Sequence, residues 1–381
     1  MKSPAVSVVN GNKTNGRPGA GKLFADGGAI MRSYEVCECG APLQLREQPT
    51  PVPVGTEVLL QITAAGICHS DIHFWEGVYD IGGGKVMRLT DRGLKLPLTL
   101  GHENVGRVVA IGPEVAGVSV GDERLVYPWI GCGSCAVCRR GDEQLCLKPQ
   151  FVGAFRPGGF SDHLLVPHPR CLVDYGDLAP EQAAPLACSG LTAYGALKKF
   201  GDLLKTEPVV VIGAGGVGLM ALAILRAMGA RGAVVVDIDP TKRGAAMQAG
   251  ALAVVDGRAA DAAAQVQAII NDRVWAVVDF VGSSSTVTLG IDLLTKGGHL
   301  VVVGLFGGEI TLPTPYIPMR AMTLQGSYTG SLPDLKELIA LLQDASMPWM
   351  PVEVRPLDSV NASLNDLKDG KVVGRLVLAP T

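Results

Sequence analysis

Four cysteines stand close together in one short, glycine-containing stretch. Cys132, Cys135, Cys138 and Cys146 follow the spacing C-x2-C-x2-C-x7-C. Four thiolates can surround one ion in a closed tetrahedral zinc site, which contributes folding free energy and leaves no open position for chemistry. An iron–sulfur cluster could use similar ligands, whereas a nucleic-acid zinc ribbon usually separates two cysteine pairs by a longer span. The spacing therefore predicts a structural zinc site.

A second set of possible metal ligands is dispersed along the chain. It comprises Cys68, His102 followed by Glu103, and Cys188. Each has an ordinary alternative, since a cysteine can be a small core hydrophobe and a histidine a satisfied polar side chain. Spacing alone does not place these residues together. If they met, two thiolates and one imidazole would leave a fourth position open, which is typical of catalytic zinc.

A glycine-rich turn lies within residues 209–218. After an apolar run, G-x-G-x-x-G occurs at Gly213, Gly215 and Gly218, with Gly216 and Val217 between them, and a helical pattern follows. The first glycine permits the turn, the second allows close approach of a pyrophosphate, and the third allows helix and strand to pack. The pattern favours dinucleotide binding over a merely structural turn.

Cofactor choice depends on the end of the next apolar run, residues 233–236. Asp237 follows it, about 20 residues after the glycine turn, and its carboxylate can accept hydrogen bonds from a ribose diol and repel a 2′-phosphate. The sequence therefore favours NAD. Lys242 and Arg243 leave NADP as an alternative, because they could pair with that phosphate.

The elements that must position these residues follow two different sequence patterns. Residues 31–186 contain short β-rich runs such as 57–62 and 106–109, while residues 187–324 alternate apolar strands and helices. We expect an α/β protein in which a mostly β catalytic domain, residues 31–186 and 325–381, carries an inserted doubly wound parallel sheet. The expected inserted elements are strands at 209–212, 233–238, 274–280 and 300–305 and a helix at 217–228, followed by a strand-like run at 323–328 and a helix at 334–343. A strand at 375–378 ends the chain, and residues 1–30 are predicted to form a mobile extension.

Composition limits the possible classes of protein. The 381 residues are 48% hydrophobic and 18% charged with a net charge of −3, which predicts a globular chain without a basic surface for nucleic acid or anionic lipid. Glycines interrupt the apolar run 208–225, so we expect no membrane span there. The first 30 residues lack a long apolar signal core, which favours a reducing cytoplasm. In that compartment clustered cysteines are more often metal ligands or catalytic groups than disulfide bridges.

These motifs together resemble the zinc-dependent medium-chain alcohol dehydrogenases from about Met31 to the C-terminus. The similarity rests on residues 66–71, 101–106 and 187–194, the four-cysteine lobe and the glycine turn. The long segment 82–100 looks most like archaeal alcohol dehydrogenases and bacterial 6-hydroxyhexanoate dehydrogenases. The resemblance implies a GroES-like catalytic domain joined to a Rossmann domain, with NAD and two zinc ions per chain.

The resemblance also implies roles for individual residues. Cys68, His102 and Cys188 would hold the catalytic zinc, with Glu103 as a transient ligand and Asp71 orienting His102. The proton relay would be Ser70 and His73, and the cofactor would contact His69, Arg375, Thr192 and Val217 in addition to the glycine turn, Asp237 and Lys242. Trp75, Trp129 and Phe155 would line the substrate channel, with ordinary core packing as the alternative.

The expected activity is reversible oxidation of primary alcohols, extending to secondary alcohols, by hydride transfer to NAD. A zinc polyol or sugar dehydrogenase is the alternative enzyme, and a non-catalytic protein that binds zinc and NAD is the alternative from another class. The expected partner is a small alcohol or aldehyde, with neither nucleic acid nor membrane. We expect a homotetramer or homodimer, since the family associates through its nucleotide domain, and residues 300–305 could serve either that contact or the buried sheet.

Overall fold

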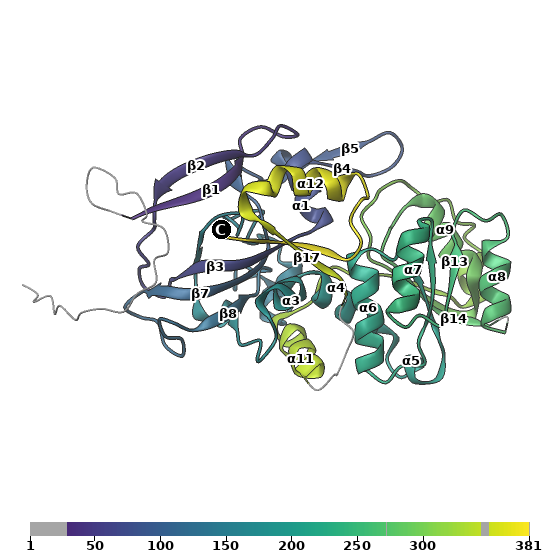
Figure 1. The fold of residues 1–381 in the computed structure, drawn as a ribbon. Coiled ribbons are helices and arrows are strands. Elements are labelled where there is room, and N and C mark those ends of the chain that lie inside the picture. The colour runs from purple at the N-terminus through teal and green to yellow at the C-terminus, as the bar shows by residue number, and fades with distance from the viewer. Residues whose placement is uncertain (1–28, 272, 344–349, 381) are drawn as a thin grey trace, which may run out of the picture.

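The computed structural model describes residues 29–271, 273–343 and 350–380, which form a β-rich domain and a parallel-sheet domain (Figure 1). The predicted extension at residues 1–30 lies outside the described residues up to position 28, and Ile30 already begins the first strand. No helix within these described ranges is both long and apolar enough to cross a membrane.

The β-rich domain is built on a seven-stranded sheet. Its strand order is β10-β8-β7-β3-β18-β17, and β9 also pairs with β3. The bounds are β3 Val58–Ile67, β7 Glu103–Ile111, β8 Glu123–Val126, β9 His163–Val166, β10 Leu172–Val173, β17 Val352–Pro356 and β18 Arg375–Ala379. Because β18 pairs antiparallel with β3, the end of the chain returns to the first domain.

Smaller elements surround this sheet. A three-stranded sheet contains β1 Ile30–Val36, β2 Gln44–Pro49 and β6 Leu98–Thr99, and β4 Val78–Asp80 pairs with β5 Val86–Arg88. The helices of this half are α1 His69–Glu76, α2 Ala136–Arg139, α3 Pro180–Ala183 and α12 Val360–Lys368. In Figure 1, α12 near the C-terminus lies over α1, in agreement with the contacts between the two helices.

The second domain is a six-stranded parallel sheet with the order β13-β12-β11-β14-β15-β16. The strands are β11 Val209–Ile212, β12 Ala233–Asp237, β13 Ala253–Asp256, β14 Val274–Asp279, β15 Leu294–Val302 and β16 Thr323–Gly326. The helices are α4 Ser189–Leu197, α5 Leu203–Thr206, α6 Gly216–Ala227, α7 Pro240–Gln248, α8 Ala262–Ile269, α9 Ser284–Leu293, α10 Tyr316–Arg320 and α11 Leu332–Gln343. Numbered within this domain, the order is 3-2-1-4-5-6, which brings dinucleotide ligands to the carboxyl ends of the strands.

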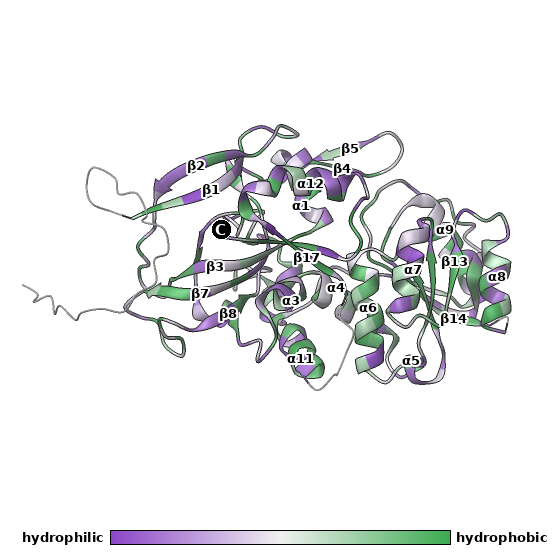
Figure 2. Ribbon diagram, viewed as in Figure 1, coloured by the Kyte–Doolittle hydropathy of each residue, from purple (hydrophilic) through white to green (hydrophobic). Residues whose placement is uncertain are grey.

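The hydrophobic core explains why these segments fold as they do. All four residues of β11 are buried, and Figure 2 shows hydrophobic residues along α6 and the strands of the parallel sheet. The apolar run at 208–225 is therefore divided between β11 and α6, as its glycines predicted. Burial on both faces is the reason that this sheet was readable from its continuous apolar runs.

Several predicted bounds differ from the structure, and two of these differences concern strands β15 and β16. The run expected at 300–305 leaves the sheet after Val302. At Gly304 the chain passes so close to Val281 that any side chain there would collide with it. Leu305 is accordingly exposed. Strand β16 continues to Gly326, so the predicted domain boundary after residue 324 falls inside this strand.

Candidate functional site

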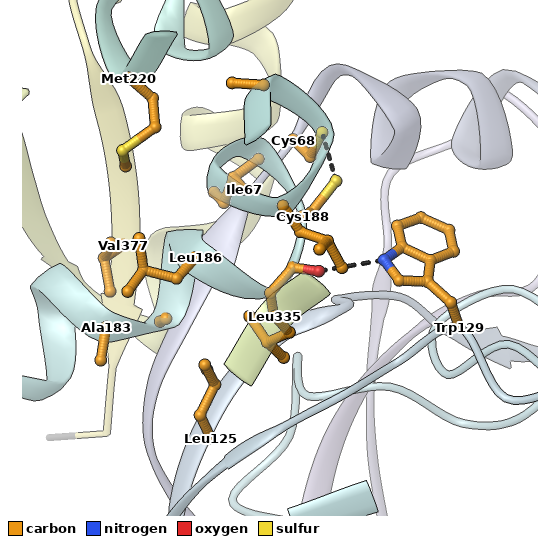
Figure 3. Packing of buried hydrophobic residues seen from close by; sticks show 14 of the residues in the cluster. Ile67, Cys68, Leu125, Trp129, Ala183, Leu186, Cys188, Met220, Leu335 and Val377 are labelled. Atoms are coloured by element: carbon orange, nitrogen blue, oxygen red, sulfur yellow. Dashed lines mark hydrogen bonds between the residues drawn. The ribbon is translucent and has the colours of Figure 1, made fainter. Parts of the chain in front are cut away.

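The dispersed candidate ligands meet in one buried cluster. Metal-binding atoms of Cys68, His102, Glu103 and Cys188 all lie within 4.8 Å of one another. The two Sγ atoms are 3.8 Å apart although 120 residues separate them, and Figure 3 shows the two side chains facing each other beside Trp129. The fold thus assembles what spacing alone could not.

The end of β3 positions the first of these ligands. Cys68 follows the strand directly and caps α1, and its backbone N–H donates to Asp71 Oδ2 at 2.8 Å. The hydrogen bond from Cys188, aided by the charges of Arg375 and His102, lowers the pKa of Cys68 well below its ordinary range. The sulfur is therefore suited to act as a thiolate ligand.

His102 is held by one ring nitrogen and free at the other. Its Nδ1 lies 3.0 Å from Asp71 Oδ1, and Asp71 also accepts from Gly101 N–H at 3.2 Å. Its Nε2 is buried and has no hydrogen-bond partner in the described residues. An unpartnered buried nitrogen next to two sulfurs, with its tautomer fixed from behind, fits the requirements of a zinc ligand.

Glu103 links the cluster to the second domain. Arg375, the first residue of β18, forms a two-point ion pair with its carboxylate, and Ser189 N–H donates to Oε1 at 3.1 Å. Burial raises the pKa of Glu103, and this effect exceeds the lowering caused by the positive charge of Arg375. A side chain at Gly66 would overlap Glu103, so that glycine in the 66–71 motif makes room for the carboxylate.

The four-cysteine lobe forms a second, local cluster. Its closest sulfur pairs are Cys132–Cys138 at 4.0 Å, Cys135–Cys138 at 3.4 Å and Cys135–Cys146 at 3.9 Å. A tetrahedral site with Zn–S bonds of about 2.3 Å has sulfur–sulfur edges of about 3.8 Å. The lobe therefore has the dimensions of a four-thiolate zinc site.

The chemistry of the lobe also favours a bound cation. The hydroxyl and backbone N–H of Ser134 lower the pKa of Cys132 to about 5, whereas burial and the neighbouring thiols raise the pKa of Cys138 to about 12. Sulfurs this close cannot all be thiolates unless a cation offsets their repulsion. Zinc supplies that charge, and its four ligands leave no position for a substrate.

The glycine turn between β11 and α6 has the geometry of a phosphate site. Gly213 has φ of +96°, and a Cβ at Gly218 would lie 1.9 Å from the Gly213 carbonyl oxygen, so both positions require glycine. A Cβ at Gly215 would meet nothing within 4 Å, which leaves the backbone accessible at the helix N-terminus. A Cβ at Gly216 would approach Arg375, so a cation stands beside this turn.

Asp237, the predicted selector of the cofactor, lies beside the glycine turn. It ends β12, its Oδ2 accepts from Ala214 N–H at 2.6 Å, and its Oδ1 accepts from Asp239 N–H at 2.8 Å. Its carboxylate is thus fixed against the glycine turn. Arg243 is already paired with Asp256 at 3.1 Å, while Lys242 lies in the first turn of α7.

The predicted relay and pyrophosphate residues occupy one face of α1. Burial lowers the pKa of His69, and the nearby positive charges of Arg375, His73 and Lys242 lower it further, while the charge of Cys68 has the opposite effect. The His69 side chain is nevertheless exposed. Ser70 and His73 are half-buried in the same helix, and burial also lowers the pKa of His73.

The structure brings two of the three predicted pocket aromatics toward the buried cluster. Trp129 lies 5.5 Å from the His102 ring, and Phe151 connects it to Phe155 at ring distances of 5.2 and 6.1 Å. The Trp129 indole N–H donates to Ala187 O at 3.0 Å (Figure 3), so this ring presents an apolar surface.

Trp75 instead packs against a different part of the domain. Its indole N–H donates to Ala41 O, and Lys368 Nζ of α12 lies 5.4 Å from its ring. Helix α1 places it on the face that contacts α12, away from the face that carries Ser70 and His73. For this residue the alternative of ordinary core packing describes the observed contacts.

Sequence reasoning did not identify two tyrosines near the cluster. The Tyr79 ring lies 4.4 Å from the His73 ring, and the Tyr328 ring lies 6.0 Å from the Trp129 ring. Tyr79 follows α1 by three residues, a spacing that could have drawn attention to it. Tyr328 lies in the loop after β16 and carries no motif in its surroundings.

Comparisons with known proteins agree with this geometry. A family model described as alcohol dehydrogenase GroES-like domain matches residues 55–175, and one described as zinc-binding dehydrogenase matches residues 216–344. Thr192 and Val217, which are predicted to contact the nicotinamide, lie on α4 and α6 respectively. Of the two, only Val217 falls within the zinc-binding dehydrogenase match.

Individual relatives cover nearly the whole chain. An NAD-dependent alcohol dehydrogenase of Sulfurisphaera tokodaii is 37% identical, covering 92% of this chain and 100% of its own length. A D-arabinose 1-dehydrogenase (NADP(+)) of Saccharolobus solfataricus is 33% identical over 89% and 95%. The alcohol dehydrogenase structure from Aeropyrum pernix is 33% identical with a TM-score of 0.82, over 92% and 100%.

These matches confirm the predicted fold class, a GroES-like domain joined to a Rossmann domain. They also confirm the prediction of an enzyme with zinc and a nicotinamide dinucleotide as cofactors. The chain therefore belongs to the zinc-dependent medium-chain alcohol dehydrogenase family.

Proposed function

We propose that this chain reversibly oxidises primary alcohols to aldehydes, and secondary alcohols to ketones, with NAD as hydride acceptor. The observation that carries the proposal is the buried cluster of Cys68, His102 and Cys188, in which His102 Nε2 has no partner among the described residues. Two thiolates would balance the charge of one zinc ion, and a neutral imidazole adds none. When bound there, zinc would supply a Lewis acid that lowers the pKa of a nearby alcohol.

The remaining polar residues of the site would handle the proton and the ligand shell. Ser70 Oγ would take the proton of the alcohol, and the His73 imidazole would pass it toward solvent. Because burial lowers the pKa of His73, its ring is a neutral base at pH 7. Asp71 would keep His102 in the tautomer that presents Nε2, and Glu103 would serve as a transient ligand.

The cofactor would lie along the carboxyl edge of the parallel sheet. Gly213, Gly215, Gly216 and Gly218 would receive the pyrophosphate together with Arg375 and His69, and Asp237 would select NAD by bonding its ribose hydroxyls. Lys242 would lie near the ribose that Asp237 binds, and Thr192 and Val217 would contact the nicotinamide. Cys132, Cys135, Cys138 and Cys146 would hold a second, structural zinc.

The sugar or polyol alternative has less support. One relative acts on D-arabinose, yet the wall next to His102 is aromatic, with Trp129 and Phe155 contributing apolar surface. Polyol recognition needs several convergent polar side chains, whereas such walls favour aliphatic or aromatic alcohols. A non-catalytic protein would not need the complete set of Ser70 and the three zinc ligands.

The assembly proposed for this enzyme is a homodimer or homotetramer. Strand β16 ends the strand order of the parallel sheet, and all four of its residues are exposed. Phe306, Met319 and Ile317 near it are also exposed, at 73%, 70% and 50%. An open sheet edge together with exposed apolar side chains is normally covered. Light scattering of wild type and Leu324→Lys tests this contact, since a monomeric wild type would contradict it.

The location proposed for this enzyme is the cytoplasm, and its nine unbridged cysteines agree with that location.

Steady-state assays test the activity directly. Wild-type enzyme is given NAD and a panel of primary alcohols, secondary alcohols, polyols and sugars, and NADH formation is followed by absorbance. We expect the highest kcat/KM for primary alcohols. Turnover of polyols or sugars alone would favour the alternative enzyme, and the absence of turnover with every alcohol would contradict the proposal.

A further inference from the structure

Two tyrosines from different domains approach the candidate active site. Gly77, with φ of +71°, ends α1 and turns the chain so that Tyr79 returns over His73, with ring centroids 4.4 Å apart. Tyr328 comes from the loop after β16, and its ring meets the edge of Trp129, which itself contacts His102. The catalytic domain and the nucleotide domain thus each contribute one phenol.

Both phenols keep part of their surface accessible. Tyr328 keeps 42% of its surface accessible, but desolvation, followed by the charge of Cys188, raises its pKa to about 12. Desolvation likewise raises the pKa of Tyr79, with further contributions from Tyr328 and Cys68. Both phenols therefore remain protonated at neutral pH, and each can donate a hydrogen bond.

Neither phenol hydroxyl has a hydrogen-bond partner among the described residues. Three other tyrosines differ: Tyr127 OH donates to Gly330 O at 3.0 Å, Tyr175 OH to Glu123 at 2.9 Å, and Tyr194 OH to Glu337 at 3.1 Å. Neither hydroxyl is among the fully buried unpaired atoms, and Tyr34 and Tyr316 also have no partner within the described residues, so these hydroxyls are open to water. Tyr79 and Tyr328 differ from those two in lying beside the candidate active site, where an oxygen of a bound ligand can replace that water.

The neighbouring side chains limit what that ligand can be. Trp129, Phe151 and Phe155 form an apolar surface, and the indole N–H of Trp129 is already used by Ala187. Arg375, the buried cation nearest the cluster, is paired with Glu103. Neutral donors beside an apolar wall suit an uncharged oxygen better than a carboxylate, which would need a cation when desolvated.

We infer that Tyr79 and Tyr328 are specificity-determining residues that select alcohols with an apolar, aromatic body and a second, uncharged oxygen distant from the carbinol. This inference rests on the proposed function, since it concerns the same site. Each phenol O–H donates to that second oxygen. A substrate with a methylene in its place leaves both donors unpaired, which lowers its relative kcat/KM.

The test uses matched substrates that differ only in that atom. Wild type, Tyr79→Phe, Tyr328→Phe and the double variant are assayed with 3- and 4-methoxybenzyl alcohol against 3- and 4-ethylbenzyl alcohol. The readout is the methoxy-to-ethyl ratio of kcat/KM. Intrinsic reactivity differences between the substrates are the same for all proteins, so a change in the ratio reports the enzyme. Tyr34→Phe, on β1, is the matched control and keeps the wild-type ratio.

We expect the ratio at one ring position to fall about tenfold in the double variant, the effect of one to two neutral hydrogen bonds, and less in each single variant. A ratio that is the same in wild type and the double variant at both positions, with all four alcohols oxidised, would overturn this inference and leave the proposed function intact. Failure of wild type to oxidise any of the alcohols would instead count against the proposed function.

Discussion

The two cysteine clusters differ in how the chain builds them. The lobe takes its four sulfurs from residues 132–146 of one loop, and Cys132, Cys135 and Cys138 are only half-buried. The active-site cluster takes its ligands from the end of β3, the start of β7 and the start of α4, and all of them are buried. A local cluster can be formed by a loop alone, whereas a dispersed one exists only when the whole domain is folded.

This difference predicts separate consequences for metal loss. Zinc in the lobe would contribute to the folding free energy of its loop, because it fixes a segment with little hydrophobic core of its own. The active-site cluster is already supported by buried strands and by the Asp71 and Arg375 contacts. Its metal would therefore matter for chemistry more than for stability.

The largest expected effect follows from removing an active-site ligand. Cys68→Ser or His102→Ala should lower kcat/KM for alcohols by about a thousandfold or more, since the loss falls on the chemical step. NADH binding should change little, because the glycine turn and Asp237 lie on the other domain. Cys37→Ser, a half-buried cysteine outside both clusters, is the matched control. Near wild-type rates in the ligand variants would contradict a zinc mechanism here.

Cofactor choice is the next largest effect. Asp237→Gly should lower kcat/KM with NAD and raise it with NADP, changing their ratio by about a hundredfold, because it removes both the ribose acceptor and a charge that repels the 2′-phosphate. Lys242 can then pair with that phosphate, while Arg243 would first have to leave Asp256. An unchanged ratio, or a wild-type preference for NADP, would show that Asp237 is not the selector.

The relay residues should give a smaller, pH-dependent effect. The lowered pKa of His73 keeps its imidazole neutral below the ordinary histidine range, so its function as a base is present at neutrality and is lost only in acid. His73→Gln should therefore slow alcohol oxidation by up to about tenfold near pH 6–7 and approach wild type at high pH, where hydroxide replaces the base. Ser70→Ala should be impaired more strongly. Normal Ser70→Ala activity at pH 7 would contradict the relay.

The lobe should give the smallest effect on turnover and a clear effect on stability. Cys135→Ser should reduce zinc per chain and lower Tm, because a site with three thiolates holds zinc more weakly. The fraction that stays folded should retain most of its kcat/KM. Circular dichroism melting and assays at low temperature test this, and a loss of kcat with unchanged Tm would mean that the lobe takes part in catalysis.

The difference between local and dispersed sites also explains which parts of the fold and the site could be predicted from the sequence. The lobe and the glycine turn were recognisable because their chemistry lies in one short segment, and Gly213 and Gly218 now show why glycine is needed. The meeting of Cys68, His102 and Cys188 depends on strand pairing over long distances, so only the family resemblance indicated it. Strands β11 and β14 were predicted well because continuous apolar runs mark buried parallel strands.

Other features depend on packing that no local pattern records. Strand β3 continues to Ile67 through small residues with weak strand preference, because that part of it is paired with β7 and β18. Trp75 and Tyr79 lie four residues apart, yet the first faces α12 and the second faces His73. Helix orientation and the turn at Gly77 decide which aromatic side chain reaches the candidate active site. Composition gives no indication of this.

Metal content per chain tests the distinction between the two clusters most directly. Elemental analysis of purified wild type, Cys68→Ser and Cys135→Ser would be combined with Tm. We predict two zinc ions in wild type and one in each variant, with Cys68→Ser folded but inactive and Cys135→Ser active but less stable. Iron with sulfide in wild type, no zinc, or equal losses of activity and stability in both variants would contradict this account.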